Sequence, residues 1–278
     1  MLSHLQDKWL PQGKSVLDSL LHPKFFDAAQ ALSQEEPETV ALAAHDELQQ
    51  GETEEMGFQE QVQATEVREG DGFASAVALV SAAVFLVVTW IATFASGTSF
   101  YWFGWHPLFQ SLSILCFTYG IVTLQPTAHP KTKAAGLTRH QLAMIVIGFP
   151  VAFLGYLAIF VNKLNSNHSH FTSWHGFFGL VTFLCMVIQI AVGGGSVWFN
   201  GALFGGNPKA KLVWKYHRAV GYVSFSFCLL TAHLGGAWSN WAMNNTWWVV
   251  RALVYTFAPA AILAAVFARV RLSKMTFW

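Results

Sequence analysis

Six long apolar stretches, separated by short polar segments, occupy the chain from residue 73 to residue 270. Each is close to the roughly 20 residues that an α-helix needs to cross the hydrocarbon core of a bilayer. They cover residues 73–95, 106–125, 139–161, 173–199, 211–238 and 247–270. This pattern predicts an all-α membrane protein with six transmembrane helices, whose second to fifth helices form a central four-helix bundle.

Helix-start signals agree with several of these limits. Pro107 and Pro208 fit the first turns of the second and fifth helices. Thr138 fits the N-cap of the third helix, and Thr172 or Ser173 fits the N-cap of the fourth. Tryptophan and tyrosine cluster at the predicted ends, which is typical of side chains at a membrane interface.

The first 72 residues differ in composition from the rest of the chain. They hold all 15 Asp and Glu residues but only four Lys and Arg. Residues 34–71 are also poor in aromatic side chains, a composition typical of disorder. No apolar segment long enough for a signal peptide precedes the first helix. We therefore expect a mostly disordered, acidic cytoplasmic tail over residues 1–72, a membrane domain over 73–270 and a short cytoplasmic C-terminus over 271–278.

Residues 73–278 contain no Asp or Glu. This excludes paired-carboxylate hydrolases, carboxylate-bridged di-iron enzymes and acidic proton relays, and it disfavours ion pumps and many transporters. Any chemistry in the membrane region therefore depends on histidine, tyrosine and thiol groups. The lipid bilayer is the expected environment, and no nucleic-acid partner is expected.

Lysine and arginine are distributed unequally between the two ends of the predicted helices. One end has only Lys163 and Arg251. The other end has ten basic residues: Lys131, Lys133, Arg139, Lys209, Lys211, Lys215, Arg218, Arg269, Arg271 and Lys274. Because positive residues stay on the cytoplasmic side, we predict a multi-pass protein of an endomembrane or the plasma membrane, with both termini in the cytoplasm.

Four histidines repeat one position in successive helices. His106, His140 and His175 open the second, third and fourth helices, and His217 lies near the cytoplasmic end of the fifth. Since successive helices run in opposite directions, His106 and His175 lie near the outer face, and His140 and His217 near the inner face. The second and fourth helices of such a bundle are diagonal neighbours, as are the third and fifth. Each diagonal thus offers two imidazoles at one depth, as the two axial ligands of a haem iron would be.

The segments around the outer histidines form an internal repeat. Trp105 to Phe109 and Trp174 to Phe178 share the pattern W-H-x-x-F, 69 residues apart. A lone intramembrane histidine is often only an interhelical hydrogen-bonding group. Four at matched depths, two of them inside a repeated motif, favour two b-type haems with irons roughly 20 Å apart.

Three other histidines of the membrane region have a different setting. His233 lies 16 residues after His217 and, at about 100° per residue, points roughly 160° away from it. We expect it to serve packing or a polar network. His168 and His170 lie in an outer loop, where solvent exposure is the simpler interpretation and metal binding the alternative.

Over about residues 73–270, these features resemble the cytochrome b561 family of membrane di-haem proteins. The similarity lies in His106-Pro107, Arg139-His140, Ser173 to Gly176, and Lys215-x-His217 with Gly221. The resemblance implies that His106 and His175 ligate an outer haem iron, and His140 and His217 an inner one. It also implies electron transfer from cytoplasmic ascorbate through both haems to an outer acceptor, either a ferric chelate or the monodehydroascorbate radical.

Two segments depart from the pattern of the best-known family members. Those members have a histidine earlier in the fourth-helix segment, as Ser-Leu-His-Ser-Trp, whereas His175 follows Trp174 here, as in the domain-containing branch. The second helix ends in Thr118 to Thr123 without the arginine of the proposed ascorbate motif. The ligands are retained, whereas the donor is less strongly specified.

Basic residues near the inner histidines are candidates for binding an anionic donor: Arg139, Lys215, Lys131, Lys133 and Lys211. The positive-inside distribution alone would also place them there. Two axial ligands per iron leave no site for dioxygen, so we predict a transmembrane ascorbate-dependent oxidoreductase rather than an oxygen-activating enzyme. The alternatives are a haem-free transporter or scaffold with a partner-recruiting acidic tail, and haems of structural or sensory role. The sequence leaves open whether the chain forms a homodimer.

Overall fold

A computed structural model of the chain describes residues 45–50 and 66–275. Residues 1–63 and 64–278 are two separate compact units. In the first unit, residues 45–50 are helical, although the sequence predicts disorder there. The rest of the predicted disordered tail lies outside the described residues, apart from residues 66–71.

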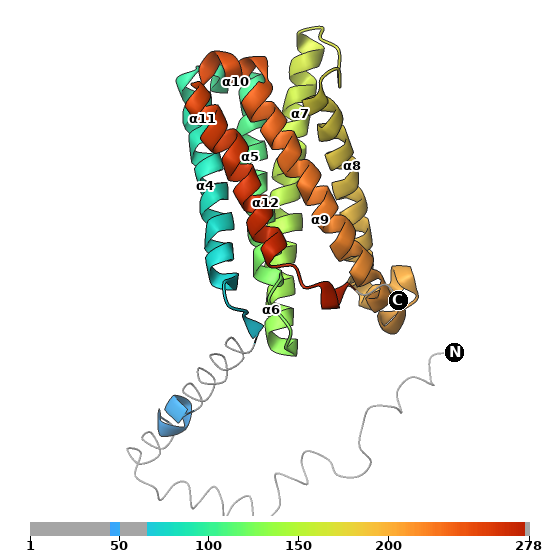
Figure 1. The fold of residues 1–278 in the computed structure, drawn as a ribbon. Helices are drawn as coiled ribbons and strands as arrows, with labels where there is room; N and C mark the ends of the chain where they lie inside the picture. Colours follow the sequence, from blue (N-terminus) through green and yellow to red (C-terminus); the bar gives the residue numbers. More distant parts are fainter. Residues whose placement is uncertain (1–44, 51–65, 276–278) are drawn as a thin grey trace, which may run out of the picture. The chain divides into compact units, whose positions relative to one another are not determined.

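Six helices of the described part are long and apolar enough to cross a membrane, which confirms the predicted fold class (Figure 1). The first two are α4 (Asp71–Ala95) and α5 (Trp102–Leu124). The third is continuous through α6 (Pro130–Gln141), the π-helical η2 (Leu142–Gly148) and α7 (Phe149–Asn165). The fourth and fifth are α8 (Trp174–Gly195) and α9 (Asn207–Trp238). The sixth consists of α11 (Trp248–Ala252), the π-helical η4 (Leu253–Phe257) and α12 (Ala258–Ala268).

Four short elements connect or follow these helices. Two are the 3-10 segments η1 (Thr98–Phe100) and η3 (Trp198–Phe204). The other two are α10 (Asn240–Asn245) and η5 (Leu272–Lys274).

Two of the predicted helix starts are wrong. The third helix begins at Pro130 instead of residue 139, and the Thr138 hydroxyl donates to the carbonyl of Ala134 inside the helix instead of capping it. Glu66 stabilises the earlier start, because its carboxylate accepts from the main-chain N–H groups of Ala128 and His129. Helix α5 begins at Trp102, so Pro107 is an interior residue.

Two other start signals are confirmed. Pro208 lies in the first turn of α9. Ser173 is the N-cap of α8, and its hydroxyl accepts from the main-chain N–H of Gly176 at 3.1 Å. His175 is therefore the second residue of a capped helix, as predicted. His106 and His140 instead lie inside their helices, one turn or more beyond the first residue.

The six helices pack as neighbouring pairs. Helix α4 packs against α5 and α12, α5 packs along the third helix, and α8 packs along α9. Within the described residues, no comparably close backbone packing joins α5 or α7 to α8 or α9. Aromatic side chains span that interval, for example Tyr156 of α7 and Phe183 of α8 with ring centres 4.7 Å apart. The histidine pairs lie in this same interval.

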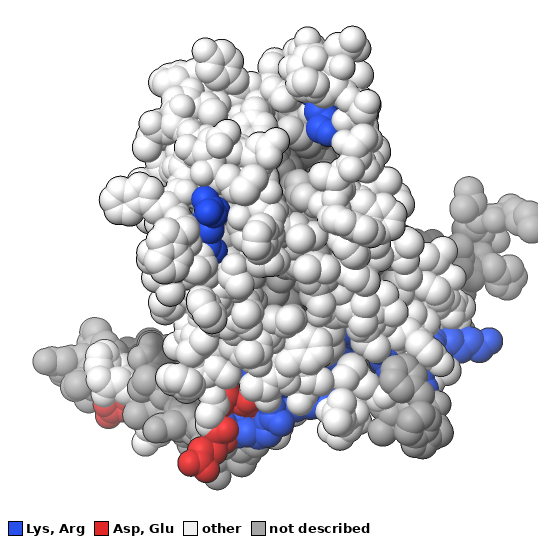
Figure 2. All heavy atoms as spheres, turned by 45° about the horizontal axis from the view of Figure 1, so that its top comes forward, with Lys and Arg blue, Asp and Glu red and all other residues white. Residues whose placement is uncertain are grey.

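Charged side chains are concentrated at one end of the bundle. Figure 2 shows most of the visible Lys and Arg there, beside the visible Asp and Glu, while the sides are almost entirely uncharged. Large apolar residues such as Ile91, Val146 and Ile188 are exposed on those sides. Exposed apolar sides between polar ends are what a lipid environment requires.

Candidate functional site

The four histidines that the sequence singles out form two close pairs. The ring centres of His106 on α5 and His175 on α8 are 5.8 Å apart. Those of His140 on α6 and His217 on α9 are 6.4 Å apart. In both pairs the ring planes are nearly perpendicular, at 79° and 89°. The tertiary structure therefore brings together the same diagonal partners that the alternating helix directions predict.

Main-chain carbonyls orient three of the four rings. The Nδ1 atom of His106 lies 3.0 Å from the carbonyl oxygen of Gly155 on α7. Nδ1 of His140 lies 3.1 Å from the carbonyl oxygen of Gly120 on α5. His175 makes the same contact with Thr231 on α9, at 2.9 Å. Because a carbonyl only accepts, Nδ1 carries the proton in each case and the lone pair of Nε2 is left for a metal ion.

Two glycines lie directly against the rings on α8 and α9. A Cβ atom at Gly235 would stand 2.6 Å from Cε1 of His175, and one at Gly193 would stand 2.6 Å from Cε1 of His217. In each case the glycine lies on the opposite helix, and its number is 18 away from the histidine of its own helix. These positions therefore require glycine for close approach, and the two contacts are reciprocal across the antiparallel α8–α9 pair.

The repeated W-H-x-x-F motif also has the same local structure in both copies. Trp105 stacks on Phe109 with a ring-centre distance of 5.3 Å, and Trp174 stacks on Phe178 at 6.0 Å. The interplanar angles are 29° and 30°. Each outer histidine thus lies on its helix between a tryptophan and a phenylalanine that stack on one another.

The paired rings fit an iron ion held by two axial imidazoles. A metal–nitrogen distance of about 2 Å on each side, with each ring centre about 1 Å behind its nitrogen, separates the two ring centres by roughly 6 Å. The observed separations of 5.8 and 6.4 Å agree with this value. Among the described residues, no His, Cys, Asp or Glu joins either pair to make a third metal-binding side chain. The remaining ligands would have to come from another source, as the four nitrogens of a porphyrin do.

The predicted donor-binding residues lie on the helices that carry the inner pair. Lys131, Lys133 and Arg139 are exposed on α6, Lys211 is exposed on α9, and Lys215 is partly buried on α9. The ammonium group of Lys133 lies 4.8 Å from the ring centre of Trp214, which links α6 to α9 beside His217. This end therefore combines cations with an aromatic surface next to the His140–His217 pair.

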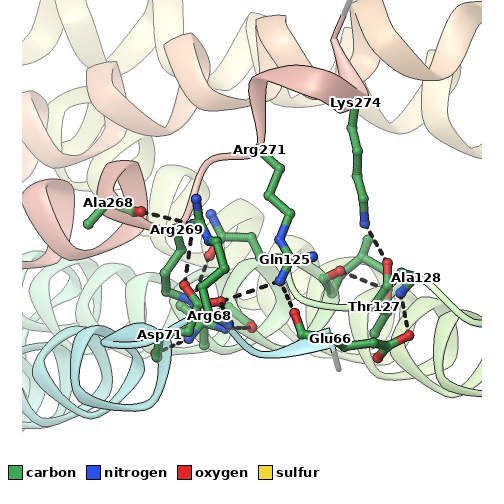
Figure 3. Close-up of polar contacts among 12 residues, drawn as sticks. Glu66, Arg68, Asp71, Gln125, Thr127, Ala128, Ala268, Arg269, Arg271 and Lys274 are labelled. Carbon is green, nitrogen blue, oxygen red and sulfur yellow. Dashed lines mark hydrogen bonds and ion pairs between the residues drawn. The ribbon is translucent and has the colours of Figure 1, made fainter. Parts of the chain in front are cut away.

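A polar network that the sequence analysis did not foresee closes the same end of the bundle (Figure 3). The Arg269 guanidinium, only 5% exposed, donates to Gln125 Oε1 and to the carbonyls of Asp71 and Val122. Lys274 donates to the carbonyl of Thr127 at 2.5 Å. Glu66 and Asp71 are the last acidic residues before or at the start of the first membrane helix, and this position was the available signal.

Glu66 is the buried acceptor of this network. Burial raises the pKa of its carboxyl, but hydrogen bonds from the His129 N–H, the Thr132 hydroxyl and the Ala128 N–H outweigh that effect and hold the pKa below its usual value. The carboxylate therefore remains ionised at neutral pH, at the positive end of the α6 dipole.

The other histidines of the membrane region lie outside the two pairs. His233 accepts from the Trp238 indole at 3.3 Å and contacts the Tyr255 carbonyl through Nδ1 at 2.9 Å, which makes it part of a polar network. His170 packs on Phe160, with ring centres 4.6 Å apart. In the same loop, Lys163 donates to the carbonyl of Ser169 at 2.7 Å.

Comparison with known proteins adds independent information. A family model of eukaryotic cytochrome b561 matches residues 105–243, which is half of the chain and includes all four paired histidines. The mouse (Mus musculus) protein named probable transmembrane reductase CYB561D1 is 28% identical over 187 residues. That alignment covers 66% of this chain and 78% of the mouse protein.

Proposed function

The chain belongs to the cytochrome b561 family, and on this premise we propose that it transfers electrons across a membrane from cytoplasmic ascorbate, with two b-type haems as cofactors. Membership of this family makes it a membrane-embedded, haem-binding oxidoreductase. The number of haems, their ligands, the donor, the acceptor and the orientation are the parts that we propose.

The pairing of the four histidines is the observation that carries the proposal. His106 and His175 would hold one haem, and His140 and His217 the other, one toward each end of the bundle. When bound, each haem iron supplies a centre that reversibly accepts one electron. The carbonyls of Gly155, Gly120 and Thr231 keep three of the rings in position and increase the electron density on the nitrogen that faces the metal.

The basic end of the bundle is proposed as the cytoplasmic, electron-donating side. Ascorbate is an anion at neutral pH, and the positive potential of Lys131, Lys133 and Lys211 raises its local concentration. Arg139 is adjacent to His140 and Lys215 is two residues before His217, so both cations accompany the inner pair.

The opposite end is proposed as the accepting side. Its loop between α7 and α8 offers Lys163, His168 and His170, a weakly basic polar group without carboxylates. A ferric chelate or the monodehydroascorbate radical, both anionic, fits this surface better than a cationic acceptor.

A difference spectrum with single-residue variants tests the haem assignment. Purified protein should show a reduced-minus-oxidised b-type spectrum with two components. His106→Ala and His175→Ala should remove one component, His140→Ala and His217→Ala the other, and the control His233→Ala neither. Colourless protein from haem-replete cells, or loss of one and the same component in His106→Ala and His140→Ala, would contradict the proposal.

Vesicles with ascorbate trapped inside test donor and acceptor. Protein oriented with its basic end inward should reduce an external ferric chelate or external monodehydroascorbate, and the faster of the two identifies the acceptor. The same vesicles with His140→Ala protein are the matched control. Haem that stays oxidised on rapid mixing with ascorbate would contradict the assigned donor.

A further inference from the structure

His217 differs from its three counterparts in its hydrogen bonding. Its Nδ1 atom is buried and has no hydrogen-bond partner among the described residues, whereas Nδ1 of His106, His140 and His175 each contacts a main-chain carbonyl. Metal-ligating histidines almost always donate this second ring N–H to a carboxylate, a carbonyl or water. A buried donor without an acceptor is costly, so an acceptor for His217 should be close by.

Gln189 on α8 has the complementary deficiency. Its Oε1 atom is also buried and without a hydrogen-bond partner among the described residues. This oxygen lies 3.6 Å from the position that a Cβ of Gly221 would occupy, and Gly221 follows His217 by four residues on α9. One unsatisfied donor and one unsatisfied acceptor thus lie on facing helices, about one helical turn apart.

The register of α8 against α9 places Gln189 where an acceptor is expected. Around the outer pair, the ring of His175 lies against Gly235, and its hydrogen-bond acceptor Thr231 precedes that glycine by four residues. Around the inner pair, the ring of His217 lies against Gly193, and the residue four positions earlier is Gln189. Gln189 therefore occupies the place that is equivalent to Thr231.

We propose that Gln189 is the positioning residue for His217, and that its side-chain carbonyl accepts the hydrogen bond from Nδ1–H. The inference rests on the proposed function, because it concerns His217 as a haem ligand. A rotation about the side-chain bonds of Gln189, which carries Oε1 from Gly221 toward the level of Gly193, makes the contact and satisfies both groups. The inner site then differs from the outer one, since a side-chain amide replaces a main-chain carbonyl as the acceptor.

This assignment gives the side chain at position 189 control over one haem. A hydrogen bond from Nδ1–H makes the ligating imidazole more electron-rich and so favours ferric iron. Removing the acceptor should raise the midpoint potential of the inner haem and leave that of the outer haem unchanged. A main-chain acceptor, as at Thr231, cannot be removed by substitution of its side chain.

Redox titration of the haem-loaded protein tests the inference. Gln189→Met, an apolar residue of similar length, should raise the midpoint potential of one spectral component and shift the low-field EPR signal of the same ferric haem. Gln189→Glu keeps an acceptor oxygen at the same distance and should return that potential to the wild-type value or below it. Thr231→Val is the matched control and should change neither component. The shorter Gln189→Asn replaces Gln189→Met if the latter fails to accumulate.

The outcomes separate this inference from the proposed function. If wild-type protein binds two haems and the Met, Asn and Glu variants at position 189 all keep wild-type potentials and EPR signals, Gln189 is not the partner of His217 and only this inference fails. A shift of the component that His106→Ala removes, rather than the one that His140→Ala removes, also overturns it. Absence of haem from the wild-type protein would refute the proposed function itself.

Discussion

His217 on α9 lies so close to Gly193 on α8 that a Cβ atom at position 193 would stand 2.6 Å from its Cε1 atom. The relationship between His175 on α8 and Gly235 on α9 is its mirror, with the same distance. Each helix of the pair therefore provides a ligand candidate at one end and a glycine that receives the partner's ligand candidate at the other. This exchange fixes the register of α8 against α9 at both proposed haem sites.

Alanine at these glycines should disturb one haem site each. Gly193→Ala displaces the ring of His217 and should weaken or abolish the inner haem component, while Gly235→Ala should do the same to the outer one. The measurement is haem content and the difference spectrum of purified protein. Gly72→Ala is the control, because no atom lies within 4 Å of its added Cβ. Equal loss of both components in Gly193→Ala would argue for general misfolding.

Glu66 should stabilise the membrane domain in a pH-dependent way. Because its folded-state pKa is lowered, its contribution is fully present above the ordinary value of 4.5 and is lost as the pH falls through the folded-state pKa. Glu66→Gln should lower the free energy of unfolding by about 1 kcal/mol at pH 7, as expected for loss of a charged helix cap. Thermal unfolding in detergent at a series of pH values should show the wild-type advantage shrinking below pH 4.5. A difference independent of pH would contradict this explanation.

Arg269 should be far more important for stability than Arg68, although both belong to the same polar network. Arg269 is 5% exposed and donates to three separate groups, so Arg269→Met leaves several buried carbonyls unsatisfied and should cost roughly 2–3 kcal/mol. The side chain of Arg68 is 47% exposed in its ion pair with Asp71, and Arg68→Met should cost less than about 1 kcal/mol. Melting temperatures of the two variants, measured side by side, decide the point.

Neutralising the basic end should slow reduction by ascorbate. Lys131→Gln combined with Lys133→Gln lowers the local concentration of an anionic donor, so the second-order rate should fall and should depend less steeply on ionic strength. Stopped-flow reduction across a salt series is the measurement. Lys163→Gln, at the opposite end, is the matched control and should leave the rate unchanged. An equal effect of Lys163→Gln would place the donor site at the wrong end.

The sequence predicted some parts of the site well because their signals are local. Apolar length identified six membrane helices, and the alternation of helix direction identified which histidines face each other. It failed where a distant residue decides the outcome. Thr138 looked like a cap, but Glu66 supplies the cap of that helix from more than 60 residues away. Pro107 looked like a helix start, but the helix begins one turn earlier, at Trp102.

The amino-acid sequence by itself determined the membrane fold class, the four histidines and the concentration of positive charge at one end, since hydropathy, residue type and charge are properties of position along the chain. Only the tertiary structure decided which carbonyl orients each ring, that Gly193 and Gly235 receive the rings, and that Gln189 and His217 lack partners near one another. These features depend on the register and rotation of one helix against the next. That register is set by side-chain packing between helices, which no local pattern of residues specifies.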